Sequence, residues 1–249
     1  MPLVIAVVTL AARKWGNVVG GVIAGMPWVG GAILLFITIE QGKDFGVQLL
    51  PGAMVGLICW LAFCSVYMIA GQRFKAFPSM IIGMVAFLAV GAVLMNITPL
   101  LSSTVWFFVL IFMIVFTIRF FPIVNDSSVG LARKIKFDIP FRMLMITVFV
   151  LTLTYFATLL GPTWSGILTP FPVMTAVLAV FTHVGQGMQQ VRLTLLGMFT
   201  GVIGFATFLF SLVFLLPEFS IGIAFLISLL INVIAALGSK YAFTKLNVV

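Results

Sequence analysis

The chain has 249 residues, of which 63% are hydrophobic and only 7% are charged. A soluble domain carries about 25% charged residues, so this composition excludes an ordinary water-soluble protein. Several apolar runs continue for about 20 residues, enough for a helix to cross a hydrocarbon core about 30 Å thick, and they lack the alternation of membrane β-strands. The net charge of +8 is spread through short loops, which argues against a nucleic-acid-binding module. We expect an all-α, polytopic transmembrane helix bundle in a lipid bilayer.

Apolar runs predict about nine helices, in chain order at 2–13, 18–40, 47–71, 78–96, 100–120, 141–160, 164–185, 191–216 and 219–239. The first is short for a crossing unless Arg13 and Lys14 extend their charged ends to the interface. Basic residues precede the apolar run of a secretory signal peptide, whereas these two follow it. No cleavable signal peptide is therefore expected.

The basic residues divide unevenly between the two sets of loops. Loops after odd-numbered helices hold Arg13, Lys14, Arg73, Lys75, Arg119, Arg133, Lys134, Lys136, Arg142, Arg192, Lys240 and Lys245. Loops after even-numbered helices hold only Lys43, beside Glu40 and Asp44. Because cytoplasmic loops of membrane proteins are enriched in Lys and Arg, we expect the N-terminus outside and the C-terminus in the cytoplasm, in a bacterial inner membrane.

An internal repeat relates two parts of the chain. Segment 16–63 matches segment 161–208 at a constant offset of 145 residues, with eleven identical pairs in 48 positions. The pairs are Gly16/Gly161, Gly21/Gly166, Pro27/Pro172, Phe36/Phe181, Gln41/Gln186, Gly42/Gly187, Leu50/Leu195, Gly52/Gly197, Gly56/Gly201, Ile58/Ile203 and Phe63/Phe208. Self-similarity at a fixed period indicates a structural repeat.

The offset equals five helices, so helices 1–4 would correspond to helices 6–9. Five is odd, so the two copies would cross the membrane in opposite directions, as the inverted repeats of many secondary transporters do. We expect a first repeat at 1–97, a connector with helix 5 and a basic cytoplasmic linker at 98–140, and a second, inverted repeat at 141–249. A complete arrangement of five plus five would need a tenth helix.

Helices 2 and 7 each contain glycines and a proline near the middle of the span. Proline removes a backbone donor and frees a carbonyl, and broken membrane helices often expose such groups to a substrate cavity. A kinked, tightly packed helix without a ligand is the alternative. The candidate substrate contacts are Gly25, Pro27, Gly30, Thr169, Pro172 and Thr175.

Helices 3 and 8 each carry a GxxxG motif, at Gly52 and Gly56 and at Gly197 and Gly201. This spacing lets helix backbones approach closely. We read these glycines as packing faces, with helix 3 against helix 8 as one arrangement.

His183, the only histidine, is expected at the inner end of helix 7, and Glu40 is expected at the outer end of helix 2. An ionisable group in a span suggests a function, so these residues are candidates for proton coupling; a plain role at the interface is the alternative. Gly42 and Gly187 are expected to end helices 2 and 7 as C-caps.

Arg133, Lys134, Lys136 and Arg142 are expected to lie on anionic lipid headgroups. Cys59 and Cys64 are five apart on one expected helix and face different directions, so neither a disulfide nor a metal site is favoured. The chain also lacks nucleotide-binding, metalloprotease and serine-hydrolase motifs. We expect no cofactor, no nucleic-acid partner and no enzymatic activity, and a homodimer is left open.

The string from Trp15 through Gly21 to Pro27, with its copy from Gly161 through Gly166 to Pro172, resembles GlpM-type bacterial membrane proteins. That family consists of small chains of roughly four helices. The resemblance spans about 1–95 and 141–240 as two fused copies, which helix 5 joins here. It implies a helical membrane bundle and a loose link to exopolysaccharide production, and it assigns no functional residue.

The leading functional hypothesis is a secondary transporter of a small solute or ion, with a midplane site between helices 2 and 7. The scarcity of polar side chains argues for an apolar, amphipathic or weakly charged substrate. A non-transporting subunit for the assembly of an envelope system is the alternative. A lipid-handling protein ranks third because no acid–base or metal constellation occurs.

Overall fold

The computed structural model describes residues 17–121, 148, 151–152, 155–156 and 159–245. The expected helix at 2–13, most of the one at 141–160, and the linker with Arg133, Lys134, Lys136 and Arg142 lie outside these residues. The total of nine helices therefore stays a prediction.

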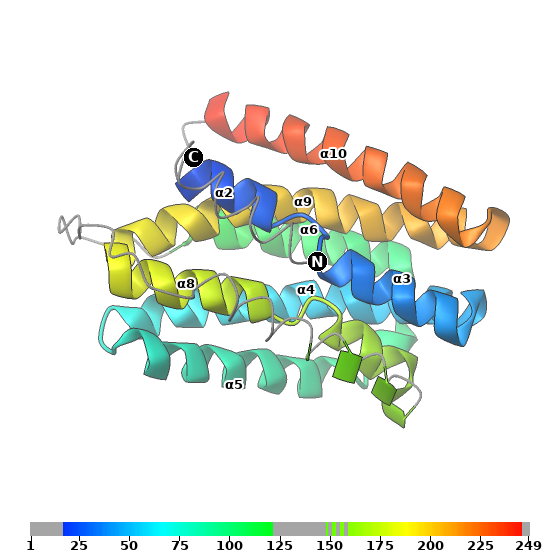
Figure 1. Ribbon diagram of the computed structural model, residues 1–249, viewed down its shortest axis with the longest axis horizontal. Coiled ribbons are helices and arrows are strands. Elements are labelled where there is room, and N and C mark those ends of the chain that lie inside the picture. Colours follow the sequence, from blue (N-terminus) through cyan, green and yellow to red (C-terminus); the bar gives the residue numbers. More distant parts are fainter. Residues whose placement is uncertain (1–16, 122–147, 149–150, 153–154, 157–158, 246–249) are drawn as a thin grey trace.

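The described residues form a helical bundle without strands (Figure 1). Its elements are α2 (Asn17–Ala24), α3 (Gly30–Gln41), α4 (Lys43–Gly71), α5 (Ala76–Leu94), the short 3-10 helix η1 (Thr98–Leu100), α6 (Ser103–Arg119), a helical segment at 159–168, α8 (Val173–Gln186), α9 (Met188–Glu218) and α10 (Ile221–Lys245). Five stretches are long and apolar enough to cross a membrane: Lys43–Gly71, Ala76–Leu94, Leu159–Gln186, Met188–Glu218 and Ile221–Ser239. The expectation of an α-helical membrane protein is confirmed at this level.

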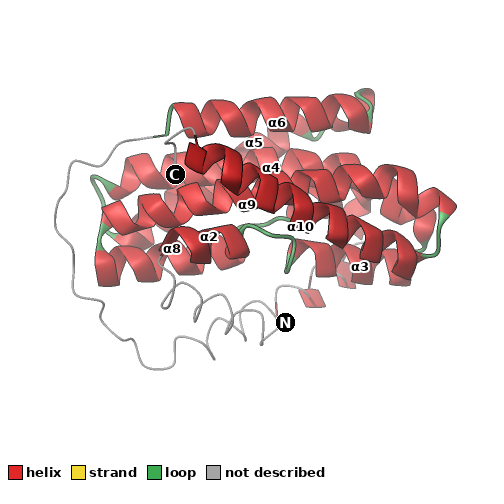
Figure 2. Ribbon diagram, turned by 90° about the horizontal axis from the view of Figure 1, so that it is seen from above, coloured by secondary structure: helices red, strands yellow, loops and turns green. Residues whose placement is uncertain are grey.

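Two long helices, α4 and α9, form the centre of the bundle. Their most apolar windows are 78% and 61% buried within the protein, against 22% and 28% for α5 and α10. α5 packs on α4 and α10 packs on α9. α2, α3 and α8 lie on one side of the central pair, and α6 lies on the other (Figure 2).

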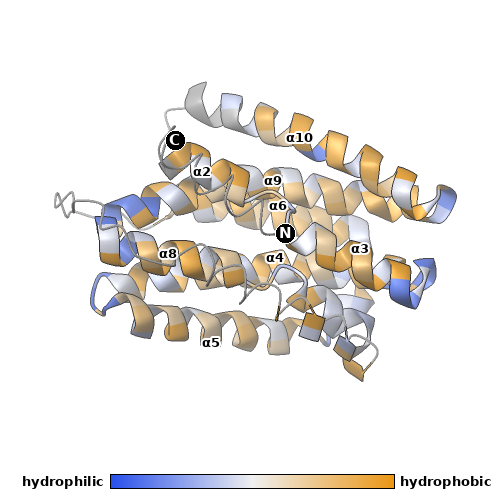
Figure 3. Cartoon of the chain, in the orientation of Figure 1, coloured by the Kyte–Doolittle hydropathy of each residue, from blue (hydrophilic) through white to orange (hydrophobic). Residues whose placement is uncertain are grey.

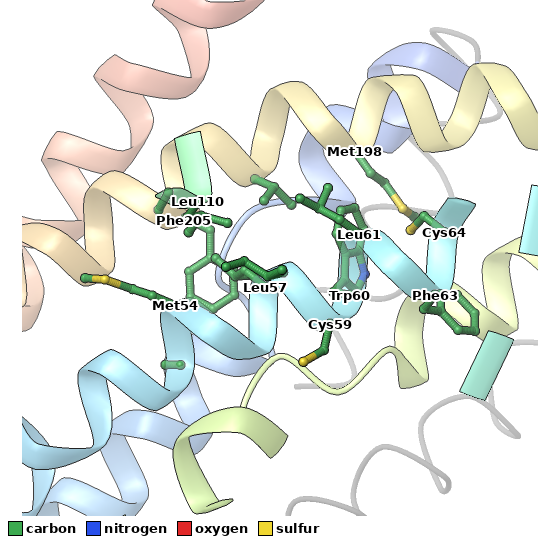
Figure 4. Close-up of a cluster of buried hydrophobic side chains, with 14 of the residues drawn as sticks. Met54, Leu57, Cys59, Trp60, Leu61, Phe63, Cys64, Leu110, Met198 and Phe205 are labelled. Atoms are coloured by element: carbon green, nitrogen blue, oxygen red, sulfur yellow. The ribbon is translucent and has the colours of Figure 1, made fainter. Parts of the chain in front are cut away.

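The side chains of the central pair are tightly interlocked. The ring of Trp60 on α4 meets that of Phe199 on α9 edge to face, with 5.5 Å between centroids. Around them lies a cluster of fully buried aliphatic, aromatic and sulfur-containing side chains (Figure 4). Large apolar side chains instead point outward from the peripheral helices, as at Val93, Phe108 and Leu226, where lipid would cover them.

Hydrophilic residues gather at the two ends of the bundle (Figure 3). One end, where α4, α6 and α8 finish and α9 begins, includes Arg73, Lys75, Arg119 and Arg192; we call it the basic end. The opposite end, where α3 and α9 finish and α4 begins, includes Glu40, Lys43, Asp44 and Glu218; we call it the acidic end.

Two pairs of consecutive helices are each joined by a single glycine. Gly42 has φ 91° and Gly187 has φ 85°, a left-handed conformation that glycine adopts without steric cost. Their N–H groups donate to the carbonyl oxygens of Thr38 and His183, so the expected helix stops are confirmed. Because the chain reverses within one residue, α4 begins at Lys43 rather than at 47, and α9 at Met188 rather than at 191.

Candidate functional site

Both helices that we expected to break at a proline are interrupted in the middle of the bundle. Residues 25–29 separate α2 from α3, and residues 169–172 separate the segment 159–168 from α8. In hydrocarbon, backbone groups outside a helix are costly, and they are tolerated where they are buried in protein or line a cavity. The two interruptions therefore mark the part of the bundle to inspect for a site.

The two interruptions have the same local geometry. Trp28 N–H donates to Met26 O over 2.8 Å, and Val173 N–H donates to Phe171 O over 2.8 Å. Each bond closes a three-residue γ-turn centred on a proline. Pro172 has φ −76°, close to the value of about −65° that the proline ring imposes.

A cavity of about 50 Å³ lies where the two interruptions meet α4 and α9. Since one water needs about 10–15 Å³ of such space, the cavity has room for a few waters or a ligand of similar size in this conformation. Its lining residues are Ala24, Gly25, Met26, Val29, Gly30, Leu57, Trp60, Thr169, Pro170, Phe171, Met174, Thr175, Val202 and Phe205. None of these residues carries a charge.

The lining residues follow a regular numbering. Adding 145 to each of the first seven gives the other seven. Ala24 thus pairs with Thr169, and Trp60 pairs with Phe205. This offset is the one that aligns segment 16–63 with segment 161–208.

The polar groups at the cavity come from few sources. Trp60 Nε1–H donates to Thr175 Oγ1 over 2.8 Å, and the hydroxyl of Thr169 donates to Ser165 O over 2.8 Å. α3 and α8 both begin at the cavity, and their N-cap residues, Val29 and Pro172, supply no side-chain hydrogen bond. A ligand would therefore meet two hydroxyls, one indole and backbone groups.

The structure brings four of the six candidate contacts to the cavity, namely Gly25, Gly30, Thr169 and Thr175. Pro27 and Pro172 are buried within the interruptions but outside the lining. Sequence reasoning missed Trp60 and Phe205, which close the cavity from α4 and α9. Their aromatic match at the repeat offset, one turn beyond each GxxxG motif, was the available signal.

The GxxxG glycines lie at close helix contacts. Gly56 faces the segment before α8, where an added Cβ would collide with Ile167 O, and Gly201 faces α2, where it would collide with Val22 O. Gly52 and Gly197 make the corresponding contacts. These glycines thus contact the first halves of the two broken helices, namely α2 and the segment 159–168. They do not pack α4 against α9, which was the arrangement considered from the sequence. The two contacts are again related by 145 residues.

The two ionisable candidates lie at opposite ends of the bundle. Glu40 is exposed near the end of α3, and His183 is partly buried near the end of α8. His183 Nδ1 is 3.3 Å from the hydroxyl of Tyr67 on α4, a hydrogen-bonding contact. A direct relay between Glu40 and His183 is thus not built into this conformation.

No protein-family model, no curated protein and no solved structure matches the chain.

Proposed function

We propose that the chain is a secondary transporter of a small solute or ion that works by alternating access around the central cavity. The observation that carries this proposal is the cavity itself, which lies between two interrupted helices in the middle of the bundle. Transporters commonly place their substrate sites near the midplane between such discontinuous helices. Interrupting one membrane helix exposes backbone groups at a cost, and this chain does so twice at one place.

We propose further that helices 1–4 and 6–9 are inverted copies related by a pseudo-two-fold axis through the cavity. Three sets of observations support it: the paired lining residues, the paired γ-turns and the paired glycine contacts, all at an offset of 145. α6 packs against both α4 and α9, on the side opposite α2, α3 and α8 (Figure 2). A helix lying across the axis leaves no room for a symmetric mate, which would account for nine helices rather than ten.

The proposed orientation places the basic end in the cytoplasm of a bacterium and the acidic end outside. It rests on the positive-inside rule and on the charges at the two ends. A reporter enzyme that works only in the cytoplasm is expected to be active when it is fused after Lys245, and one that works only outside the cytoplasm is expected to be inactive there. A reporter found outside would contradict the orientation and leave the cavity unaffected.

The lining favours a very small substrate that is neutral or weakly charged. The described residues of the wall include no carboxylate, ammonium or guanidinium group. Burying an ion without such a partner is costly unless backbone dipoles replace its water. The hydroxyls of Thr169 and Thr175 are the side-chain groups best placed to orient a polar solute, since both residues are at least nine-tenths buried at the cavity.

Purified protein in liposomes tests the proposal with a panel of small neutral and singly charged solutes. Thr169→Val keeps the side-chain volume and removes a hydroxyl that lines the cavity and donates to Ser165 O of its own segment. Flux of a transported solute should therefore fall about two- to tenfold, the equivalent of one hydrogen bond. Thr207→Val is the matched control, because its hydroxyl donates to Gly204 O within α9 and does not line the cavity. Absence of flux for every solute would refute transport, and co-purification with another protein would then favour an assembly subunit.

A further inference from the structure

Two side-chain hydrogen bonds join α4 to α8 between the cavity and the basic end. The first, from Trp60 Nε1 to Thr175 Oγ1, is 2.8 Å long and lies at the cavity wall. The second joins the Tyr67 hydroxyl to His183 Nδ1 over 3.3 Å, about two helical turns further along both helices. Together they connect the two helices along the route from the cavity to the basic end.

The α4 residues on this route form one stripe of the helix. Trp60, Cys64, Tyr67 and Gly71 are spaced by four, three and four residues, which places them on one face. All four are buried. At the last position, the glycine packs against the side chains of Met188 and His183. The route is thus closed by direct packing in this structure.

The corresponding route toward the acidic end has a different chemistry. Subtracting or adding 145 converts the Trp60–Thr175 pair into Phe205 and Gly30, and the Phe205 ring packs on Gly30 without a polar contact. The Tyr67–His183 pair becomes Leu212 and Thr38. Leucine has no polar side-chain atom, and the Thr38 hydroxyl donates to Leu34 O of its own helix.

We propose that the two hydrogen bonds form a latch that holds the basic-end exit of the cavity closed, so that the acidic-end exit opens more readily. This inference rests on the proposed transport function. In a repeat protein the two exits are built alike, so their relative ease of opening depends on the contacts that the copies do not share. A hydrogen bond lost from a buried interface shifts such an equilibrium about two- to tenfold.

The native cysteines report on the latch. Cys64 lies in the stripe between the two hydrogen bonds, whereas Cys59 lies on another side of α4 (Figure 4) and faces Gly91 of α5. In a Cys59→Ala protein, the labelling rate of the remaining Cys64 therefore measures opening of the route. In a Cys64→Ala protein, the labelling rate of the remaining Cys59 measures general loosening of the bundle. The probe is a small, charged, membrane-impermeant methanethiosulfonate, added to one face of oriented vesicles at a time.

Tyr67→Phe keeps the ring and removes the hydroxyl. We expect it to raise the labelling rate of Cys64 about two- to tenfold from the basic end only, with Cys59 unchanged. Thr38→Val, at the position equivalent to His183, is the matched control and should leave both rates unchanged. Unchanged or undetectable labelling of Cys64 in Tyr67→Phe would overturn the latch, and so would an equal rise from both faces or at both cysteines.

Labelling and flux separate the two proposals. Flux with no change in labelling would leave transport standing without the latch. Altered labelling with no flux of any solute would refute transport, and with it the role of these bonds as an exit latch.

Discussion

Gly201 offers a sharp test of the close contact between α9 and α2. In Gly201→Ala the new methyl group would collide with Val22 O and lie 3.0 Å from Gly25 Cα. Both obstacles are backbone, so α2 must move as a unit. Overpacking of this kind costs about 1–3 kcal/mol, while alanine gains up to about 1 kcal/mol of helix propensity over glycine. The free energy of unfolding should therefore fall by about 1–2 kcal/mol.

The control for this substitution is Gly238→Ala in α10, where an added Cβ meets nothing within 4 Å. There only the propensity gain remains, so stability should rise by about 0.5–1 kcal/mol. Both variants are measured by denaturant titration in the same detergent. Gly56→Ala should match the loss at Gly201, because it meets Ile167 O in the same way. If Gly201→Ala were as stable as Gly238→Ala, the described contact would be wrong.

Two further predictions concern stability in the same assay. Gly42→Ala and Gly187→Ala should each cost about 1–3 kcal/mol, because φ near 90° combined with ψ of 166° and 171° is a backbone region that essentially only glycine occupies. Asparagine should cost about as much as alanine at both positions, and alanine variants as stable as the wild type would contradict the strain argument. Ser228→Ala should raise stability by about 1 kcal/mol, since its buried hydroxyl lacks a partner among the described residues, whereas Ser239→Ala should lower it by a similar amount by removing the bond to Thr200 O. Equal effects of the two serine variants would refute that distinction.

Much of the helix pattern could be predicted from local sequence signals. Pro27 and Pro172 lack a backbone donor, which favours an interruption at each position. Proline alone does not force one, because α4 continues through Pro51. The turns at Gly42 and Gly187 were predictable for a similar reason. The starts of the following helices were placed too late, because the polar residues after Gly42 resemble a loop, whereas the structure includes them in the first turn of α4.

It was harder to predict which helices contact one another than to predict where each helix begins and ends. A GxxxG motif indicates that another backbone approaches closely, but it does not indicate which one. Nothing in the spacing predicts that Gly201 contacts α2 rather than α4. The contact between Tyr67 and His183 joins residues 116 positions apart and has no local signature. The set of cavity residues could have been extended from the sequence, since each candidate implies a second one at the repeat offset, as Thr169 implies Ala24 and Gly25 implies Pro170.

If α6 crosses the membrane once between the two proposed repeats, it has a consequence for how such a chain could arise. Two four-helix units joined directly would enter the membrane in the same direction, since an even number of crossings returns the chain to its starting side. One additional crossing reverses the second unit, so that the interrupted helices of the two units face each other in opposite directions across one cavity. If the repeat is inverted as proposed, an ancestral form without α6 would have required separate copies inserted in both directions, and the fusion with α6 fixes their ratio at one to one.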